Sequence, residues 1–368
     1  MEELVMRMNN PLSGDLNHIL NHTAGLWQEM RGKRIFITGG TGFFGCWLVE
    51  SFAWANDNLD LNAKAIVLTR NYDSFQTKAP HLTSNPAIQF HGGDVKNYHF
   101  PDGKFSHIIH AAASTDVKLY DENPLHMYDA IVEGTRHTLD FAFHCNAQKF
   151  LLISSGAVYG KQPSDMTNVP EDYCGAPDPT DVDSVYGEGK RVAELLCVLF
   201  AKKYNIETKI ARCFAFVGPY LPLDIHYAVG NFIRDGLNGG PILVNGDGTP
   251  YRSYLYAADL AIWLWTILFK GEPCCPYNVG SEDAVTIAEL ADNVTRCFRK
   301  PVEIRIAKIP IQDKPAVRYV PSTKRVREIL GLRESISRIH GIKRTILFHQ
   351  GIAKTIGGHH TYYDKKTY

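Results

Sequence analysis

The chain has no excess of charge of either sign. Its 368 residues carry 39 Lys plus Arg and 39 Asp plus Glu, so the formal net charge is zero with histidine neutral. A balanced surface has no overall field that would concentrate nucleic acid or an anionic membrane around the protein. We therefore expect neither as a partner, and any anionic ligand must be held by local groups.

Long apolar runs and an evident leader segment are also missing. The longest mainly apolar run, Leu260–Phe269, is well short of the roughly 20 residues that cross a bilayer and predicts a buried helix. The first ten residues mix Glu2, Glu3 and Arg7 into a short apolar stretch, without the basic-then-apolar order of a signal peptide. These features favour a cytoplasmic protein that does not enter a membrane.

Paired-cysteine motifs are absent as well. The eight cysteines are scattered without a CxxC pair, in a chain long enough to bury a core without disulfides. We expect reduced thiols. His359 and His360 lie in a Gly-containing tail without a partnered Cys or carboxylate, so no metal site is predicted.

Short β-type runs alternate with helical stretches from Lys33 onward. Such alternation predicts βαβ units, and hence a doubly wound parallel sheet with helices on both faces. The predicted strands are Arg34–Thr38, Ala65–Thr69, His107–Ala111, Phe150–Ser154 and Thr208–Arg212. The sequence therefore belongs to the α/β fold class.

Changes of pattern along the chain suggest four segments. Apolar residues at helical spacing over residues 14–30 predict an amphipathic helix ahead of the main fold. After Gly218-Pro219 the sequence becomes more irregular and richer in Gly and Pro, which suggests a smaller second lobe. The expected segments are a helical extension over 1–30, the main α/β domain over 31–218 with some later segments returning to it, a smaller lobe over 219–350, and a loosely ordered tail over 351–368.

A glycine-rich turn follows the first predicted strand and opens a helical stretch. Gly39 permits a tight turn, Gly42 lets backbone N–H groups approach a pyrophosphate, and Gly45 allows close helix–strand packing. The helix N-terminus also favours an anion. Such a turn can be purely structural, but its position between a first strand and a helix predicts dinucleotide binding. The expected contacts include Phe43 and Phe44.

Tyr186 and Lys190 are four residues apart, which places them on one face of a predicted helix. A free tyrosine has a pKa of about 10, too high for a base at neutral pH, and a neighbouring ammonium stabilises the phenolate. A Tyr and a Lys at this spacing also occur on ordinary helix surfaces. The order of motifs is more informative, because Ser154–Gly160 (SSGAVYG) lies between the glycine turn and Tyr186.

Together these motifs resemble the extended short-chain dehydrogenase/reductase family, in its nucleotide-sugar epimerase/dehydratase branch, over residues 33 to about 335. The resemblance implies a Rossmann-type domain that binds NAD or NADP and a smaller C-terminal substrate-binding lobe. It also implies three catalytic residues: Ser155 contacts the substrate hydroxyl, Tyr186 deprotonates it, and Lys190 also holds the nicotinamide ribose. The implied partner is a nucleotide sugar, and relatives are frequently dimers, so a homodimer is possible.

The resemblance extends to other cofactor positions. Asp94, followed by Val95, matches the family's adenine-contacting aspartate, and Ala111 and Ala112 match the small-residue strand end beside the cofactor. NAD-preferring relatives often carry an acid at the end of the second strand, but this chain has none there. Arg70 could pair with a 2′-phosphate, which leans the interpretation toward NADP, although it could also be a surface side chain.

Two positions after Ser155 depart from the family. Sugar 4,6-dehydratases of this branch usually carry Asp and Glu there, and UDP-glucuronate decarboxylases tend to carry Glu at the second position, whereas Gly156 and Ala157 cannot transfer a proton. Ile131 and Ala215 also stand at two positions where relatives in this family commonly have Asn. These departures favour a reaction that needs only hydride transfer at C4 of the sugar. Among such enzymes we expect a 4-epimerase first, and a 4-reductase or dehydrogenase second. A dehydratase with another acid–base pair, or a non-catalytic dinucleotide-binding protein, remains an alternative.

Two arginines are candidates for holding the substrate diphosphate. Arg252 lies in a segment that resembles the family's phosphate-binding segment, and Arg318 is a looser second candidate; guanidinium geometry suits phosphate oxygens. Each could instead be a surface arginine. A steroid or flavonoid dehydrogenase of the same family would keep Tyr186 and Lys190 without needing Arg252, so Arg252 favours a nucleotide sugar.

Overall fold

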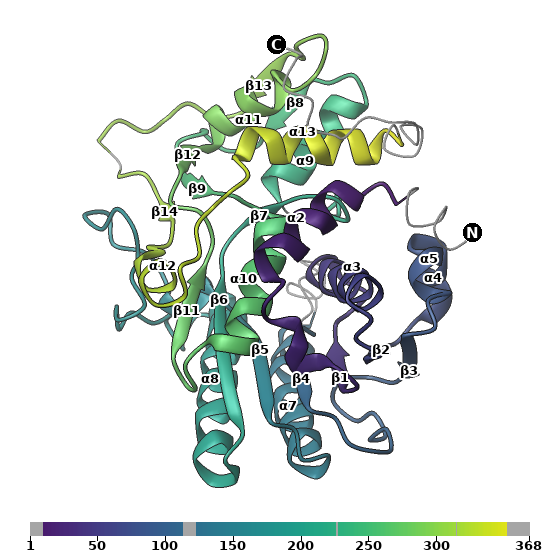
Figure 1. Ribbon diagram of the computed structural model, residues 1–368. Coiled ribbons are helices and arrows are strands. Elements are labelled where there is room, and N and C mark those ends of the chain that lie inside the picture. Colours follow the sequence, from purple (N-terminus) through teal and green to yellow (C-terminus); the bar gives the residue numbers. More distant parts are fainter. Residues whose placement is uncertain (1–9, 113–122, 226, 314, 352–368) are drawn as a thin grey trace.

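The computed structural model describes residues 10–112, 123–225, 227–313 and 315–351 (Figure 1). Seven parallel strands form one sheet in the order β3–β2–β1–β4–β5–β6–β11. Their bounds are β1 Arg34–Thr38, β2 Lys64–Thr69, β3 Ile88–Gly92, β4 His107–His110, β5 Lys149–Ser155, β6 Glu207–Cys213 and β11 Pro276–Val279. The strand order reverses between β1 and β4, which confirms the doubly wound Rossmann-type sheet.

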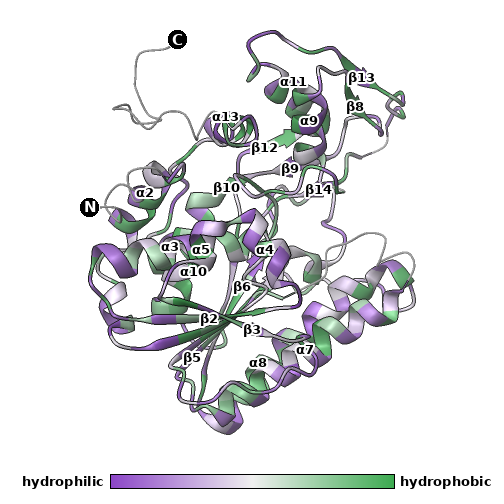
Figure 2. Cartoon of the chain, turned by 90° about the vertical axis from the view of Figure 1, so that its right-hand side faces the viewer, coloured by the Kyte–Doolittle hydropathy of each residue, from purple (hydrophilic) through white to green (hydrophobic). Residues whose placement is uncertain are grey.

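Strand residues alternate between two hydrophobic cores, because successive side chains point to opposite faces of a sheet. Ile35 and Ile37 belong to the core that includes α3 and α10, and Phe36 belongs to the core that includes α7 and α8. The two pairs of helices lie on opposite sides of the sheet (Figure 2). The helices are α3 Phe43–Asn58, α7 Pro124–His144, α8 Val185–Tyr204 and α10 Ala257–Lys270. Strands that are covered on both faces consist of nearly continuous apolar residues, and these runs made the strands predictable from the sequence.

The N-terminal extension is a helix followed by a separate turn. Helix α2 (Ser13–Thr23) ends before the short 3₁₀ helix η1 (Trp27–Met30), so the single helix expected over 14–30 is interrupted. Trp27 is fully buried, with its ring centroid 4.6 Å from that of Trp265 in α10. The extension therefore completes the core on the α10 side of the sheet.

A smaller group of helices and strands lies above the main sheet in the view of Figure 1. Its helices and strands are β7 Phe216–Val217, α9 Ala228–Leu237, β8 Ile242–Val244, β9 Tyr251–Ser253, β10 Leu255–Tyr256, β12 Ala284–Thr286, α11 Ile287–Thr295, β13 Ile304–Ile306, β14 Arg318–Tyr319 and α13 Arg338–His349. The strands form three small sheets, β10–β7, β12–β9–β14 and β13–β8. Within the expected range 219–350, α10 and β11 return to the main sheet. Shorter elements are α4 Tyr72–Lys78, α5 Pro80–Thr83, η2 Gly156–Tyr159, η3 Val182–Ser184 and α12 Lys324–Leu330.

The apolar run Leu260–Phe269 is buried within α10, as the sequence predicted. Among the residues that the structure describes, no helix combines the length and the apolar character needed to cross a membrane. Most of the proposed tail, from residue 352 onward, lies outside the described residues.

Candidate active site

The glycine turn brings β1, α3 and the end of β4 into close contact. Gly39 has a φ of +69°, and a Cβ on it would lie 2.6 Å from backbone atoms of Ala111 and Ala112. Gly45 is buried, and a Cβ there would overlap the backbone of Gly39. Gly42 is different: it is exposed, and the nearest atom to a Cβ would be the Gly39 carbonyl oxygen at 3.4 Å. The fold therefore requires Gly39 and Gly45, while Gly42 leaves its side open to a ligand.

Helix α3 begins directly after this turn without a side-chain cap. Gly42 is the N-cap residue and provides no side-chain hydrogen bond to the first turn. The first N–H groups of a helix have no intrahelical partner, and an anion can accept from them. Phe43 and Phe44 are half-buried on this turn, and Phe44 packs edge-on against Phe216 at 4.9 Å. These residues fit the pyrophosphate of a dinucleotide.

A buried histidine fixes the end of β4 against the end of β1. His110 shares hydrogen bonds with Thr38 Oγ1 at 2.9 Å and Thr135 Oγ1 at 3.1 Å. Thr38 Oγ1 also accepts the N–H of Ala112 at 3.2 Å. Burial lowers the pKa of His110 to about 3, so its ring is neutral near pH 7. The contacts hold Ala111 and Ala112 beside the glycine turn; the next residue, Ala113, lies outside the described residues.

The other predicted cofactor residues follow neighbouring strands. Arg70 is exposed immediately after β2, and Asp94 follows β3, where its Oδ1 accepts the N–H of Lys96 at 3.0 Å. Val95 packs on α7, because a Cβ on Gly134 would lie 2.8 Å from Val95 Cγ1. The carboxyl ends of parallel strands meet at one edge of the sheet, so these residues share the edge that carries the glycine turn.

The structure brings the three predicted catalytic residues together. Lys190 is buried in α8, and its Nζ donates to the Ile153 carbonyl oxygen at 2.8 Å while lying 5.9 Å from the centroid of the Tyr186 ring. Ser155 ends β5, two residues after Ile153, and its Oγ accepts the N–H of Ala157 at 3.1 Å. The Lys190–Ile153 bond thus ties α8 to β5 next to Ser155.

Burial dominates the ionisation of both groups on α8. It raises the pKa of the Tyr186 phenol above its ordinary range, against a smaller lowering by hydrogen bonding with Ser155. It lowers the pKa of Lys190 to about 8. In the protein alone the phenol is therefore protonated at neutral pH, and Lys190 is not among the main influences on its pKa. Stabilisation of the phenolate by Lys190, which the Tyr–Lys spacing predicts, stays a prediction for the complex with cofactor.

Tyr319, which the sequence analysis did not select, also reaches this site. Its Oη lies 3.5 Å from Ser155 Oγ, and its ring centroid is 4.7 Å from that of Phe214. A Cβ on Gly156 would lie 2.8 Å from Tyr319 Oη and 2.7 Å from the Phe214 ring. The space beside Ser155 is therefore filled by two aromatic side chains from elsewhere in the chain.

The two candidate phosphate arginines face different ways. Arg252 pairs with Tyr319 in the β9–β14 register, and its guanidinium carbon lies 5.8 Å from the Tyr319 ring centroid. Arg318 instead lies over the Tyr251 ring at 4.2 Å and donates to the Thr167 carbonyl oxygen at 3.2 Å. Neighbouring residues of a strand point to opposite faces. The structure thus brings Arg252, but not Arg318, toward the side of Tyr319 and Ser155.

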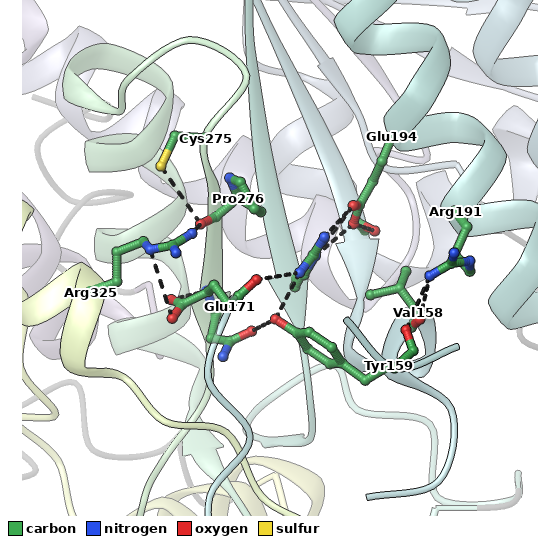
Figure 3. A network of polar contacts seen from close by, with 12 residues as sticks. Val158, Tyr159, Glu171, Arg191, Glu194, Cys275, Pro276 and Arg325 are labelled. Atoms are coloured by element: carbon green, nitrogen blue, oxygen red, sulfur yellow. Dashed lines mark hydrogen bonds and ion pairs between the residues drawn. The ribbon is translucent and has the colours of Figure 1, made fainter. Parts of the chain in front are cut away.

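A buried network of polar contacts involves residues that are close in sequence to the catalytic candidates (Figure 3). Arg212 donates to both carboxylate oxygens of Glu194, and its Nη1 donates to Tyr159 Oη at 2.9 Å. Glu194 is one helical turn after Lys190 and also accepts from Ser154 Oγ at 2.6 Å. The network therefore fixes α8 relative to β5 at the residues next to the site.

The same network continues into the C-terminal segments. Tyr159 Oη donates to Asn278 Oδ1 at 2.8 Å, and Glu171 accepts the N–H of Asn278 at 2.9 Å. Asn278 Nδ2 also donates to the Ser322 carbonyl oxygen at 3.0 Å, three residues after Tyr319. Arg325 lies 4.0 Å from Glu171 (Figure 3). These contacts hold the loop after β5, β11 and the segment after β14 together.

The described residues offer neither a metal site nor a disulfide. Within the described ranges, no group of three or more His, Cys, Asp or Glu side chains is arranged to hold a metal ion. The adjacent His359 and His360 lie outside those ranges. All eight cysteines are free thiols, and four of them are buried.

The chain is similar in sequence to a family of known enzymes over most of its length. The model of the NAD dependent epimerase/dehydratase family matches residues 35–280. UDP-glucuronic acid decarboxylase 6 of Arabidopsis thaliana is 30% identical over 309 residues, covering 84% of this chain and 86% of the relative. UDP-glucuronic acid decarboxylase 1 of Danio rerio is 27% identical, covering 87% and 73%.

Solved structures share the fold at lower identity. A UDP-glucose 4-epimerase from Thermotoga maritima with UDP-glucose has a TM-score of 0.71 and 20% identity, covering 87% of this chain and 99% of that structure. A dTDP-glucose 4,6-dehydratase from Streptomyces venezuelae with NAD bound has a TM-score of 0.72 and 22% identity, covering 86% and 97%. Enzymes that catalyse different reactions thus share this architecture. The fold alone does not determine the reaction, which depends on the residues of the site.

Proposed function

The chain belongs to the NAD dependent epimerase/dehydratase family and is an enzyme of that family, and we propose that it performs NAD(P)-dependent oxidation and reduction at C4 of a nucleotide-activated sugar. Within this class we favour a 4-epimerase over a 4-reductase or dehydrogenase. One observation carries the proposal: Ser155, Tyr186 and Lys190 lie together, while Tyr319 and Phe214 fill the space that a side chain at Gly156 would need.

Each residue has a distinct part in this proposal. A bound oxidised nicotinamide dinucleotide would supply the hydride acceptor and a positive charge near the phenol. Tyr186 takes the proton of the C4 hydroxyl, and Ser155 orients that oxygen by a hydrogen bond. Lys190 keeps α8 against β5 through the Ile153 carbonyl and would hold the nicotinamide ribose. Return of the same hydride from the reduced dinucleotide to the opposite face of C4, with the proton returned by Tyr186, would give the epimer.

A 4,6-dehydratase would need more than this set. It must remove the C5 proton and expel the C6 hydroxyl as water, which requires an acid and a base besides Tyr186. Burial has the largest effect on the pKa of Tyr186, and among the described residues the groups that follow it are Tyr319, Ser155, Tyr227 and Cys213, none of which is a carboxylate. This favours a reaction confined to hydride and proton transfer at C4.

A decarboxylase is the second candidate, because relatives of that name match most of the chain at about 30% identity. Oxidation at C4 of a nucleotide-linked hexuronic acid produces a β-keto acid, which loses carbon dioxide with little help from acid–base groups. The residues present at C4 could therefore support this reaction as well. The difference lies in whether the substrate carries a carboxylate at C6.

A product assay separates these reactions. The purified protein is incubated with NAD or NADP and with UDP-, dTDP-, GDP- and CDP-hexoses, and separately with UDP-glucuronic acid. We expect a C4 epimer or a change of oxidation state at C4 from a nucleotide hexose. Carbon dioxide release from UDP-glucuronic acid would favour the decarboxylase, and a 4-keto-6-deoxy product absorbing in alkali would favour the dehydratase.

Cofactor and substrate contacts are proposed at the residues predicted from the sequence. Gly42 and the first turn of α3 would hold the pyrophosphate, and Asp94 the adenine. The exposed Arg70 after β2 supports a preference for NADP. Arg252, which faces Tyr319, would hold the substrate diphosphate.

The assembly and compartment are proposed on separate grounds. Leu195, Val198 and Leu199 are exposed on α8 at spacings of three and four residues, so they form one apolar stripe on that helix. We propose that a second copy of the chain covers this stripe in a symmetric dimer. The eight free thiols favour a reducing compartment such as the cytoplasm.

A further inference from the structure

Tyr319 reaches the active site from a part of the chain far from the catalytic motifs. Its backbone pairs with β9 on one side, opposite Arg252. On the other side the next residue, Val320, donates its N–H to Gln162 Oε1 at 3.0 Å and accepts the N–H of Val169 at 2.9 Å. The residue is therefore held between two segments of backbone.

The ring of Tyr319 is fixed as firmly as its backbone. Phe214 packs against it with ring centroids 4.7 Å apart, and the guanidinium carbon of Arg252 lies 5.8 Å from the ring centroid. The hydroxyl group then points at the end of β5: it lies 3.5 Å from Ser155 Oγ and 2.8 Å from the position that a Cβ on Gly156 would take. A phenol in this position is presented to the site without needing a conformational change.

Three hydroxyl groups meet at this point. Ser155 has hydrogen-bonding influence on the pKa of both Tyr186 and Tyr319. Burial raises the pKa of Tyr319 to about 12, against the opposing effects of Ser155 and Arg252. Tyr319 therefore keeps its proton through the neutral range and serves as a hydrogen-bond donor, while Tyr186 is the one placed beside Lys190.

We propose that Tyr319 is an additional catalytic residue, which together with Ser155 donates a hydrogen bond to the C4 oxygen of the sugar. This inference rests on the proposed oxidation and reduction at C4. Donors separated by 3.5 Å can both contact one oxygen at a normal hydrogen-bond distance of about 2.8 Å. Tyr319 breaks no covalent bond and keeps its own proton; Tyr186 takes the proton of the C4 hydroxyl.

Such a pair of donors acts on the charge that develops at the C4 oxygen as its proton leaves. Donors already placed where charge develops stabilise the transition state more than the ground state. They would also explain how the site functions with Gly156, because the hydroxyl of Tyr319 fills the space where a side chain at residue 156 would enter the site.

The test compares Tyr319→Phe with Tyr186→Phe and a matched control, Tyr204→Phe. Tyr204 lies at the far end of α8, where its ring packs on Phe143 at 4.3 Å and Phe200 at 5.2 Å. The assay uses the nucleotide hexose from the UDP, dTDP, GDP and CDP panel that the wild type converts. Tyr319→Phe should lower kcat by about 10²-fold with little change in KM, as loss of one such donor does. Tyr204→Phe should match the wild type.

The outcomes separate this inference from the proposed function. If Tyr319→Phe kept the kcat of the wild type while Tyr186→Phe lost activity, the proposed role of Tyr319 would be contradicted and the proposed function would stand. A raised KM at unchanged kcat would make Tyr319 a binding residue and also contradict the inference. No conversion of any panel sugar by the wild type would remove the proposed function and this role with it. NADP and NAD titrations and a thermal melt of Tyr319→Phe, both expected to match the wild type, exclude a general loss of structure.

Discussion

Arg212 donates two hydrogen bonds to the carboxylate of Glu194, from Nε at 3.0 Å and from Nη2 at 2.7 Å, and both side chains are largely buried. Glu194 follows Lys190 by one helical turn and also accepts from Ser154, the neighbour of Ser155. The pair therefore connects the stability of the fold with the placement of two proposed catalytic residues.

We expect Arg212→Met to destabilise the protein by about 3 kcal/mol, because it leaves the Glu194 carboxylate buried without its cation. Turnover should fall as well, since α8 loses a fixed position against β5. Chemical denaturation and steady-state kinetics measure the two effects. The control is Arg136→Met, which breaks an exposed pair with Asp140 and should change stability by less than about 1 kcal/mol. Equal effects of the two substitutions would contradict the role of the buried pair.

Lys190 should cost the protein stability while serving catalysis. Its folded-state pKa of about 8 lies below the ordinary 10.5, so below pH 8 the buried ammonium carries a penalty of about 3 kcal/mol. As pH rises from 8 toward 10.5 the unfolded chain binds more protons than the folded one, and the penalty disappears. Lys190→Met should therefore raise stability at pH 7, lose this gain at high pH, and lower turnover strongly.

Thermal melts across this pH range check the prediction about Lys190. Lys202→Met, which changes an exposed lysine on the same helix, is the control and should show no pH-dependent gain. A Lys190→Met variant less stable than the wild type at pH 7 would mean that the hydrogen bond to the Ile153 carbonyl outweighs the cost of burying the charge.

Most of the main sheet could be predicted from the sequence, because strands buried on both faces read as apolar runs. The run Arg34–Thr38 is observed as β1 with the same bounds, and the other four predicted strands differ by one residue at an end or at both ends. Strand β3 was not predicted, since only Ile88 of its five residues is buried. The place of β11 at the sheet edge next to β6 depends on a long-range pairing that no local pattern encodes.

The candidate site shows the same division. Ser155, Tyr186 and Lys190 were found because they lie in short motifs whose spacing has a chemical reason. Tyr319 was missed although its neighbour Arg318 was selected: alternation places the two on opposite faces of β14, and only the pairing with β9 decides which one faces Ser155. Arg212 and Glu194 were likewise invisible, because their contact joins a strand and a helix that no motif connects.

The lean toward NADP depends on Arg70 and can be tested directly. We expect Arg70→Ala to weaken NADP binding about 10-fold or more and to leave NAD binding nearly unchanged, because only NADP carries the 2′-phosphate. Calorimetric titration of both cofactors gives the ratio. Arg31→Ala, an exposed arginine outside the cofactor edge, is the control. Preference of the wild type for NAD, with a ratio that Arg70→Ala does not alter, would show that Arg70 is only a surface residue.

The proposed dimer predicts that a charge on the apolar stripe of α8 dissociates the protein. Leu199→Glu places a carboxylate within the proposed interface, so the molar mass measured by light scattering should fall from that of two chains to that of one. Leu243→Glu, at a similarly exposed leucine of β8, should leave the mass unchanged. A wild-type protein with the mass of a single chain would contradict the proposal outright.

Gly39 and Gly42 should respond differently to the same substitution. A methyl group on Gly39 would meet the backbone of Ala111 and Ala112, and residue 39 has a φ of +69°. Gly39→Ala should therefore destabilise the protein even without a cofactor, by about 1 kcal/mol or more. A methyl group on Gly42 would meet only the Gly39 carbonyl oxygen at 3.4 Å, and residue 42 has an ordinary φ of −77°, so Gly42→Ala should keep the stability of the wild type. It should nevertheless weaken dinucleotide binding, because the pyrophosphate would approach the backbone at that residue. Thermal melts without cofactor, followed by titration with NAD and NADP, test both halves. If Gly42→Ala bound the dinucleotides as tightly as the wild type, the glycine turn would be structural at both positions and the pyrophosphate would have to bind elsewhere.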